Sequence, residues 1–186
     1  MPEHLLAVVA GPGRQVPTRV TGLLLPPDIE ITGMQFSHPP DSALWWIQLG
    51  VRVASPEGLE LLIKRLNRLI DVLRVVTLEP DGHRRQSVYV RLRPAAGDLA
   101  QIGELVRWFH AETLELTAEA VVLHLTAAPG QCSAFVSMLR PHGVVEAVTS
   151  AVSGFRTGVR ATNRLPYALA RPSSRSQQPV SRGEPQ

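Results

Sequence analysis

The stretch that most constrains the fold is residues 55–79, where a clearly marked helix runs directly into an apolar strand. Ser55 is suited to cap this helix, Pro56 fits its first position, where no amide hydrogen is needed, and Glu57 lies at the positive end of the helix dipole. An apolar stripe follows at intervals of three and four residues: Leu59, Leu62, Ile63, Leu66 and Ile70. Residues 72–78 are rich in β-branched side chains, so the unit is predicted to be a helix followed by a strand.

The segments before this unit complete a regular order. Residues 4–10 form an apolar run that stops at a Gly-Pro-Gly turn, which favours a buried strand. A short helix is expected over 16–24, because helical spacing lasts until the proline pair at 26–27. Residues 29–37 and 43–54 are extended runs, predicted to pair as an antiparallel hairpin. The resulting order is that of the ferredoxin-like βαββαβ fold, in which two helices cover one face of a four-stranded antiparallel sheet.

The same order is predicted a second time after a turn at residues 80–82. Strands are expected at 87–94, 114–119, 120–127 and 144–152, and helices at 99–109 and from Pro129 to a terminating Gly143. Asp98, with Gln101 three residues later, gives a capping pattern for the first of these helices. Their inward faces are predicted to carry Leu99, Ile102, Leu105, Val106 and Phe109, and then Cys132, Phe135, Val136 and Leu139.

We therefore expect an α+β protein with two ferredoxin-like βαββαβ domains in tandem, over residues 1–80 and 81–164. Residues 165–186 consist largely of Arg, Ser, Pro and Gln and are expected to form a disordered tail. From Arg164 onward, four arginines against one acid account for the whole net charge of +3. Residues 1–163 are neutral overall, so nothing before the tail supplies the basic face that nucleic-acid binding needs.

Several other classes of function find no support in the sequence. There is no apolar run of about 20 residues and no signal-peptide pattern, so a cytoplasmic protein without membrane contact is expected. The six histidines show no metal-ligand spacing, and the single Cys132 is predicted to be a buried, inert thiol. No nucleophile, base and orienting group recur together, so no catalytic residue is assigned. Trp45 and Trp46 are expected on opposite faces of one strand, one in the core and the other exposed or at an interface.

Two sequence motifs resemble those of a known family. Residues 65–79, RLNRLIDVLRVVTLE, are similar to the "QLNKLIDVLKVVDL" signature that closes the N-terminal ACT domain in small regulatory subunits of acetolactate synthase (acetohydroxyacid synthase). Residues 138–146, MLRPHGVVE, and then 156–159, RTGV, resemble the "LLRPFGIIE" and "RTG.VA" of the family's C-terminal domain, although the spacing between them is longer here. The resemblance runs from about residue 4 to residue 164.

This resemblance implies a function and a partner. The expected function is a non-catalytic regulatory subunit of branched-chain amino-acid biosynthesis, forming a homodimer through its ACT sheet edges and binding a catalytic acetolactate synthase subunit. Thiamine diphosphate, Mg and FAD are implied for that catalytic partner alone, and no cofactor is expected in this chain. The alternative is a free-standing ACT-type sensor that binds another small ligand and acts on a different partner. An enzyme on a ferredoxin-like fold is a weaker third possibility, because no catalytic constellation is present.

The resemblance also suggests where an amino-acid effector would bind, and there the match weakens. The family carries "ENRPGVLARVSGLF" at the turn into the first helix and "RRGFNI" on the next strand. Counting without gaps puts Pro12 at the first family Asn and Gln15 at the Gly, whereas a two-residue insertion puts Ala10 at the Asn and keeps Gly13 in the "PG" pair. Both alignments lose the first Asn. The candidate effector residues are Ala10, Gly11, Gly13, Gln15, Glu30 and Ile31.

Glu30 replaces the second family Asn. An ionised carboxylate accepts hydrogen bonds but cannot donate them, and it repels an effector's own carboxylate by about 1–4 kcal/mol at about 4 Å near a protein surface. We therefore expect weak or absent feedback by valine. An equally open interpretation is that Glu30 is a solvated strand residue, and that Gly11 and Gly13 only shape a turn.

Overall fold

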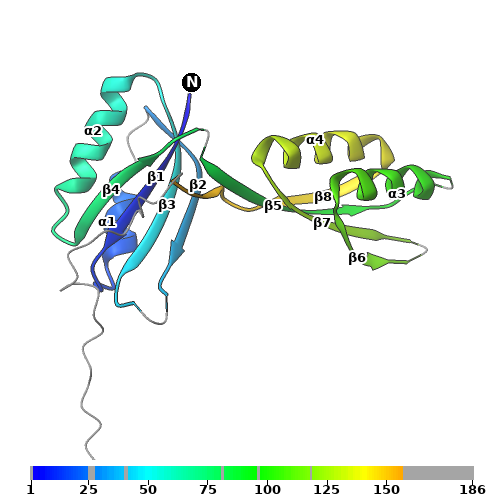
Figure 1. The fold of residues 1–186 in the computed structure, drawn as a ribbon, viewed down its shortest axis with the longest axis horizontal. Helices are drawn as coiled ribbons and strands as arrows, with labels where there is room; N and C mark the ends of the chain where they lie inside the picture. Colours follow the sequence, from blue (N-terminus) through cyan, green and yellow to red (C-terminus); the bar gives the residue numbers. More distant parts are fainter. Residues whose placement is uncertain are drawn as a thin grey trace, which may run out of the picture.

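The computed structural model describes residues 2–24, 28–39, 42–80, 82–95, 97–117 and 119–156. Two antiparallel sheets, each with two helices, lie end to end along the molecule (Figure 1). The first unit contains β1 (Glu3–Ala10), α1 (Val16–Gly22), β2 (Ile29–Ser37), β3 (Trp45–Val53), α2 (Pro56–Asn67) and β4 (Val72–Leu78). Its strand order, β2-β3-β1-β4, is the ferredoxin-like order predicted from the sequence.

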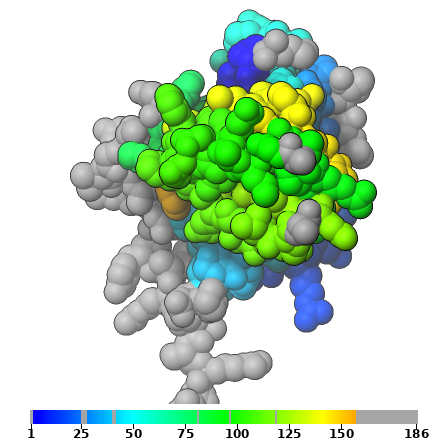
Figure 2. Space-filling view, turned by 90° about the vertical axis from the view of Figure 1, so that its right-hand side faces the viewer, coloured from blue at the N-terminus to red at the C-terminus, as the bar shows by residue number. Residues whose placement is uncertain are grey.

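The second unit repeats this topology. It contains β5 (His83–Leu92), α3 (Asp98–Phe109), β6 (Glu112–Leu116), β7 (Val121–Ala127), α4 (Pro129–Leu139), a short 3₁₀ turn η1 (Arg140–His142) and β8 (Val144–Thr149). The strands lie in the order β6-β7-β5-β8, the same arrangement as in the first unit. Figure 2 looks along the molecule, with the second unit in front of the first. The α+β class and the two ferredoxin-like units are thus confirmed.

Each unit has its own core between its helices and one sheet face. In the first unit, Leu62 and Leu66 of α2 and Val20 of α1 pack on Leu6 and Val8 of β1. In the second unit, the predicted inward residues of α4 are buried: Cys132, Phe135 and Leu139. Since apolar burial contributes about 25 cal/mol per Å², these two clusters are the main stabilising feature of each unit.

The predicted start of α2 is confirmed in detail. Ser55 caps the helix, and its hydroxyl oxygen accepts the amide of Gly58 at 3.2 Å. The predicted end of the stripe is wrong, because the helix stops at Asn67 and Ile70 is 88% exposed. The physical reason lies at Asp71, whose carbonyl accepts the amide of Gly11 at 2.7 Å and so holds the chain close to the end of β1.

Two predicted details of α3 are also wrong. Asp98 is the first helical residue rather than the cap, and its carboxylate accepts the amide of Ala95 at 3.1 Å. Leu99 is 51% exposed, because it lies at the rim of a groove between α3 and β6, facing Leu116. The other predicted inward residues of α3 do pack on the second core: Ile102, Leu105, Val106 and Phe109.

The strand boundaries differ most from expectation in the second unit. β5 begins at His83, four residues earlier than predicted, β6 and β7 are shifted, and β8 ends at Thr149. An unpredicted short strand, β9 (Ser153–Phe155), pairs with the start of β5. Gly143 terminates the α4 segment in the left-handed conformation, φ +80°, as predicted. The prolines at 26–27, the turn residue Asp81 and the tail lie outside the described residues.

Candidate functional site

The predicted effector turn, residues 10–15, lies at the end of β1 and is held by Asp71. The backbone carbonyl of Asp71 accepts the Gly11 amide, and a side chain at Gly13 would approach the Asp71 carboxylate to 3.4 Å. Ala10 is fully buried in the first core. The Asp71 contacts are a feature that the sequence comparison did not single out.

Arg19 of α1 joins this turn to Asp71. Its guanidinium donates to the Asp71 carboxylate at 2.7 Å and to the side-chain oxygen of Gln15 at 3.1 Å. The Arg19 and Asp71 side chains are partly exposed, so the pair contributes at most about 1 kcal/mol. A carboxylate ligand at this turn would therefore meet an acid whose charge is already balanced by Arg19.

Glu30 lies on β2 and also has a cationic partner. Its carboxylate accepts a hydrogen bond from Arg52 at 2.7 Å, and the two residues are directly opposite each other on β2 and β3. Ile31, the next residue, is 41% exposed. Arg52 could have been proposed from the alternating pattern of β3, in which it is a charged residue one position before the end of an apolar strand.

The strand register separates the two groups of predicted effector residues. Glu3 and Glu30 both lie opposite Arg52, whereas Ala10 lies opposite Trp45 at the other end of β3. Seven residues at about 3.3 Å each separate these two levels by about 23 Å. One chain therefore does not bring the residue 10–15 turn and Glu30 together, and their joint role in effector binding stays a prediction.

A short segment after β8 connects the two units. We define residues 150–156 as the return segment, which includes β9. The Gln48 side chain on β3 donates to the Gly154 carbonyl at 2.8 Å and accepts the Gly154 amide at 2.9 Å. Ser153 donates to the side-chain oxygen of Gln35, and Val152 packs with the buried Leu5. The return segment thus lies on the face of the first sheet opposite its helices.

Arg156 closes this junction with an ion pair. Its guanidinium donates to the carboxylate of Glu79 at 3.0 Å. This hydrogen bond, with a second one from the backbone, lowers the pKa of Glu79 below its ordinary value. Arg156 is the first residue of the RTGV motif, and residues 157–159 lie outside the described residues.

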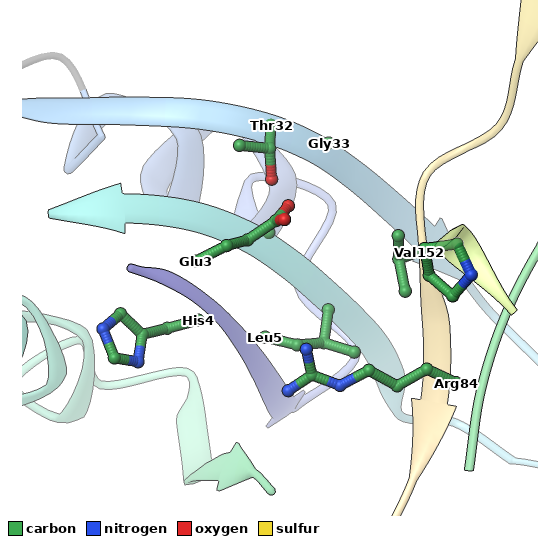
Figure 3. Close-up of a pocket in the computed structure, with 9 residues that line it drawn as sticks. Glu3, His4, Leu5, Thr32, Gly33, Arg84 and Val152 are labelled. Atoms are coloured by element: carbon green, nitrogen blue, oxygen red, sulfur yellow. The ribbon is translucent and has the colours of Figure 1, made fainter. Parts of the chain in front are cut away.

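A pocket opens beside the return segment, on the same face of the first sheet (Figure 3). Its polar lining includes Glu3, Thr32 and Arg84, and Leu5 and Val152 supply apolar surface. In Figure 3, Arg84 extends from β5 towards β1, and the Glu3 carboxylate lies close to Thr32. The pocket has a volume of about 80 Å³, which is small beside the roughly 300–1,000 Å³ of sites for drug-sized ligands.

A row of polar side chains crosses the helix-free face of the second sheet. Glu112 contacts the His124 ring at 3.3 Å, the other ring nitrogen contacts the Thr126 hydroxyl at 3.3 Å, and that hydroxyl contacts Ser87 at 2.7 Å. Tyr89 stacks on the imidazole with the ring centroids 4.5 Å apart. Because the Thr126 hydroxyl is already engaged by Ser87, we assign these contacts to cross-strand stabilisation of the sheet.

The other residues considered in the sequence, the cysteine, the potential metal ligands and the two tryptophans, have structural surroundings as follows. Cys132 is buried, and its thiol donates to the Gln86 carbonyl at 3.2 Å. Among the residues that the structure describes, no group of three or more His, Cys, Asp or Glu side chains is placed to hold a metal ion. Within the same residues, every helix is too short or too polar to cross a membrane. Trp45 packs on the first core and Trp46, which follows it on β3, is half-buried.

Comparison with known proteins supports the resemblance seen in the sequence. A family profile described as "Small subunit of acetolactate synthase" matches residues 85–158. The acetolactate synthase small subunit of Mycolicibacterium smegmatis is 27% identical over 160 residues, which cover 86% of this chain and 94% of the relative. That of Bacillus subtilis is 23% identical over 143 residues, which cover 76% and 83% of the two chains.

A solved structure extends the likeness to the fold. The crystal structure of the acetolactate synthase small subunit from Thermotoga maritima superposes with a TM-score of 0.75 at 19% identity, covering 86% of this chain and all of that one. The profile lies in the second unit, and the bacterial relatives span both units. This chain is therefore similar to acetolactate synthase small subunits along both of its units.

Proposed function

We propose that this chain is a non-catalytic regulatory subunit, which binds a catalytic acetolactate synthase subunit of branched-chain amino-acid biosynthesis and raises its activity. The observation that carries this proposal is the likeness to acetolactate synthase small subunits along nearly their whole length. In this proposal the thiamine diphosphate, Mg and FAD belong to the catalytic partner, and this chain carries no cofactor. The complex works in the cytoplasm.

A homodimer is part of the same proposal. β2 is an outer strand of the first sheet, and its Ile31 and Met34 side chains are exposed. An unpaired strand edge with apolar side chains is suited to pair with a second copy. Two copies also offer a way to combine the residue 10–15 turn of one chain with Glu30 of the other, which a single chain holds about 23 Å apart by strand register. We keep the domain division at residues 1–80 and 81–164 as part of this proposal.

Weak or absent valine feedback belongs to the proposal as well. The Glu30 carboxylate is engaged by Arg52, so a ligand at this strand would have to compete with an ion pair at 2.7 Å. Neither group offers the combined donor and acceptor of a side-chain amide. At the turn, Ala10 has no polar side chain and Gln15 is engaged by Arg19.

Co-purification with the catalytic subunit encoded in the same genome tests the proposal. We expect a stable complex and a higher rate of acetolactate formation than the catalytic subunit shows alone. The Ile31→Lys variant should lower the oligomeric state, because it places a charge on the proposed edge, whereas Met138→Lys at an exposed site of α4, away from any strand edge, serves as the control. Absence of both binding and rate change would favour a free-standing sensor, which thermal-shift screening with amino acids would then identify.

A further inference from the structure

The pocket between the two units carries two opposite charges that do not neutralise each other. Glu3 on β1 and Arg84 on β5 both line it, yet within the described residues neither side chain forms an ion pair. Arg84 is held in place through one nitrogen, which donates to the Leu78 carbonyl at 3.0 Å. Its Nε is buried and, among the described residues, has no hydrogen-bond partner. A buried donor without a partner costs about 1–3 kcal/mol, and because this nitrogen is closed to solvent, an acceptor in the pocket reaches it only when the Arg84 side chain shifts.

The shape of the pocket depends on glycines. A Cβ atom at Gly50 would lie 2.4 Å from the Thr32 hydroxyl, and one at Gly33 would lie 3.0 Å from Ala151 of the return segment. Both positions therefore keep space free of side chains between the first sheet and the return segment. Leu5 and Val152 supply the apolar part of the wall.

We propose that this pocket binds a small zwitterionic α-amino acid. The carboxylate of the ligand accepts hydrogen bonds from the Arg84 guanidinium, and its ammonium group donates to the Glu3 carboxylate. A compact aliphatic side chain packs against Leu5 and Val152. An α-amino acid holds its two charges apart, which suits a site whose cation and anion do not touch each other.

This site is separate from the residue 10–15 turn, lies beside Glu30 and Ile31 on β2, and does not depend on the proposed function. The residue 10–15 turn lies at the other end of β1 from Glu3, and Glu30 is engaged by Arg52. The pocket is formed by both units, because Glu3 belongs to the first and Arg84 to the second. A ligand here would contact both units at their junction.

Isothermal titration calorimetry on the full chain tests the site with alanine and valine as probes, and with propionate and ethylamine as ligands that keep only one of the two charges. Glu3→Gln and Arg84→Met each remove one charge of the pocket. Glu60→Gln and Arg107→Met remove the same charges from exposed positions on α2 and α3. Glu3 is exposed at the start of β1, so its replacement should not disturb folding. The Glu3 variant therefore still tests the site if the Arg84 variant does not fold.

The expected result is binding of at least one amino acid by the wild-type chain and about a tenfold or greater loss of affinity in the Glu3 and Arg84 variants, with the two control variants unchanged. Propionate and ethylamine should bind at least about tenfold more weakly than the amino acid. The inference is overturned if neither amino acid binds, if the one-charge ligands bind as well, or if the Glu3 variant binds like the wild type. None of these outcomes bears on complex formation with the catalytic subunit.

Discussion

The side chain of Gln48 and the backbone of Gly154 form a two-way hydrogen-bonded contact, with the amide nitrogen donating at 2.8 Å and the amide oxygen accepting at 2.9 Å. These residues are 106 positions apart in the chain and belong to different units. The contact imitates the pairing of a neighbouring strand, because it satisfies both backbone groups of one residue. It therefore fixes the return segment on the first sheet.

Replacing Gln48 by Ala should destabilise the junction. The amide and carbonyl of Gly154 would lose their partners in a partly buried place, at a cost of about 1–3 kcal/mol. Gln48→Glu should have a smaller effect, because a carboxylate still accepts the Gly154 amide. Hydrogen exchange at Gly154 and urea unfolding measure both effects. The exposed Gln101→Ala is the control, and equal exchange in all four proteins would contradict the role assigned to Gln48.

The Arg156–Glu79 pair predicts a pH dependence. The pKa of Glu79 is lowered in the folded protein from an ordinary value of 4.5 by the Arg156 hydrogen bond. Its contribution to stability is therefore fully present above pH 4.5 and disappears as the pH falls through the folded value. Glu79→Gln should be less stable than the wild type at neutral pH, and the difference should shrink as the pH falls through the lowered pKa of Glu79 in the folded protein.

Urea unfolding of both proteins in a series from neutral to acidic pH measures this difference. The exposed Glu60→Gln should show little difference from the wild type at either end, because surface ion pairs contribute little. A Glu79→Gln difference that grows as the pH falls would contradict the sign.

The sequence was sufficient for features that depend on local pattern. The Ser55 cap, the buried Leu62 and Leu66, and the left-handed Gly143 follow from spacing and residue type, and each is confirmed. The prediction that Ile70 faces inward was wrong, because the surroundings of Ile70 depend on a contact between Asp71 and Gly11, which are distant in the chain. Periodicity carries no information about such a contact.

The junction between the two units could not be predicted from the sequence for a similar reason. β9 has three residues and pairs with residues about 70 positions earlier, so no run of its own marks it as a strand. Among the candidate effector residues, identity alone did not reveal that Arg52 engages Glu30 or that Asp71 organises the turn at Gly11. Both partners come from neighbouring elements, and their pairing depends on strand register.

Gly143→Ala should destabilise the second unit. Gly143 has φ +80°, and a Cβ atom there would lie 2.3 Å from the Arg93 carbonyl oxygen. Backbone strain alone costs about 1–3 kcal/mol, and the clash adds to it. Gly103→Ala is a control of opposite sign. It lies inside α3 with open space around it, and the change should stabilise by about 0.5–1 kcal/mol. Thermal unfolding of both variants measures the contrast, and a neutral Gly143→Ala would contradict it.

Calorimetry with valine tests the divergent effector residues. The wild-type chain should not bind valine with micromolar affinity at the residue 10–15 turn and Glu30, because Glu30 offers only a carboxylate already engaged by Arg52. Glu30→Asn restores an amide that both donates and accepts, and combined with Ala10→Asn it should tighten valine binding at least about tenfold. Ala10 is fully buried, so its replacement costs about 1–3 kcal/mol of stability, and folding of the double variant must be verified by thermal unfolding first. Micromolar binding by the wild type that Glu3→Gln leaves intact would contradict the prediction, because it would assign the ligand to the turn rather than to the pocket at the junction.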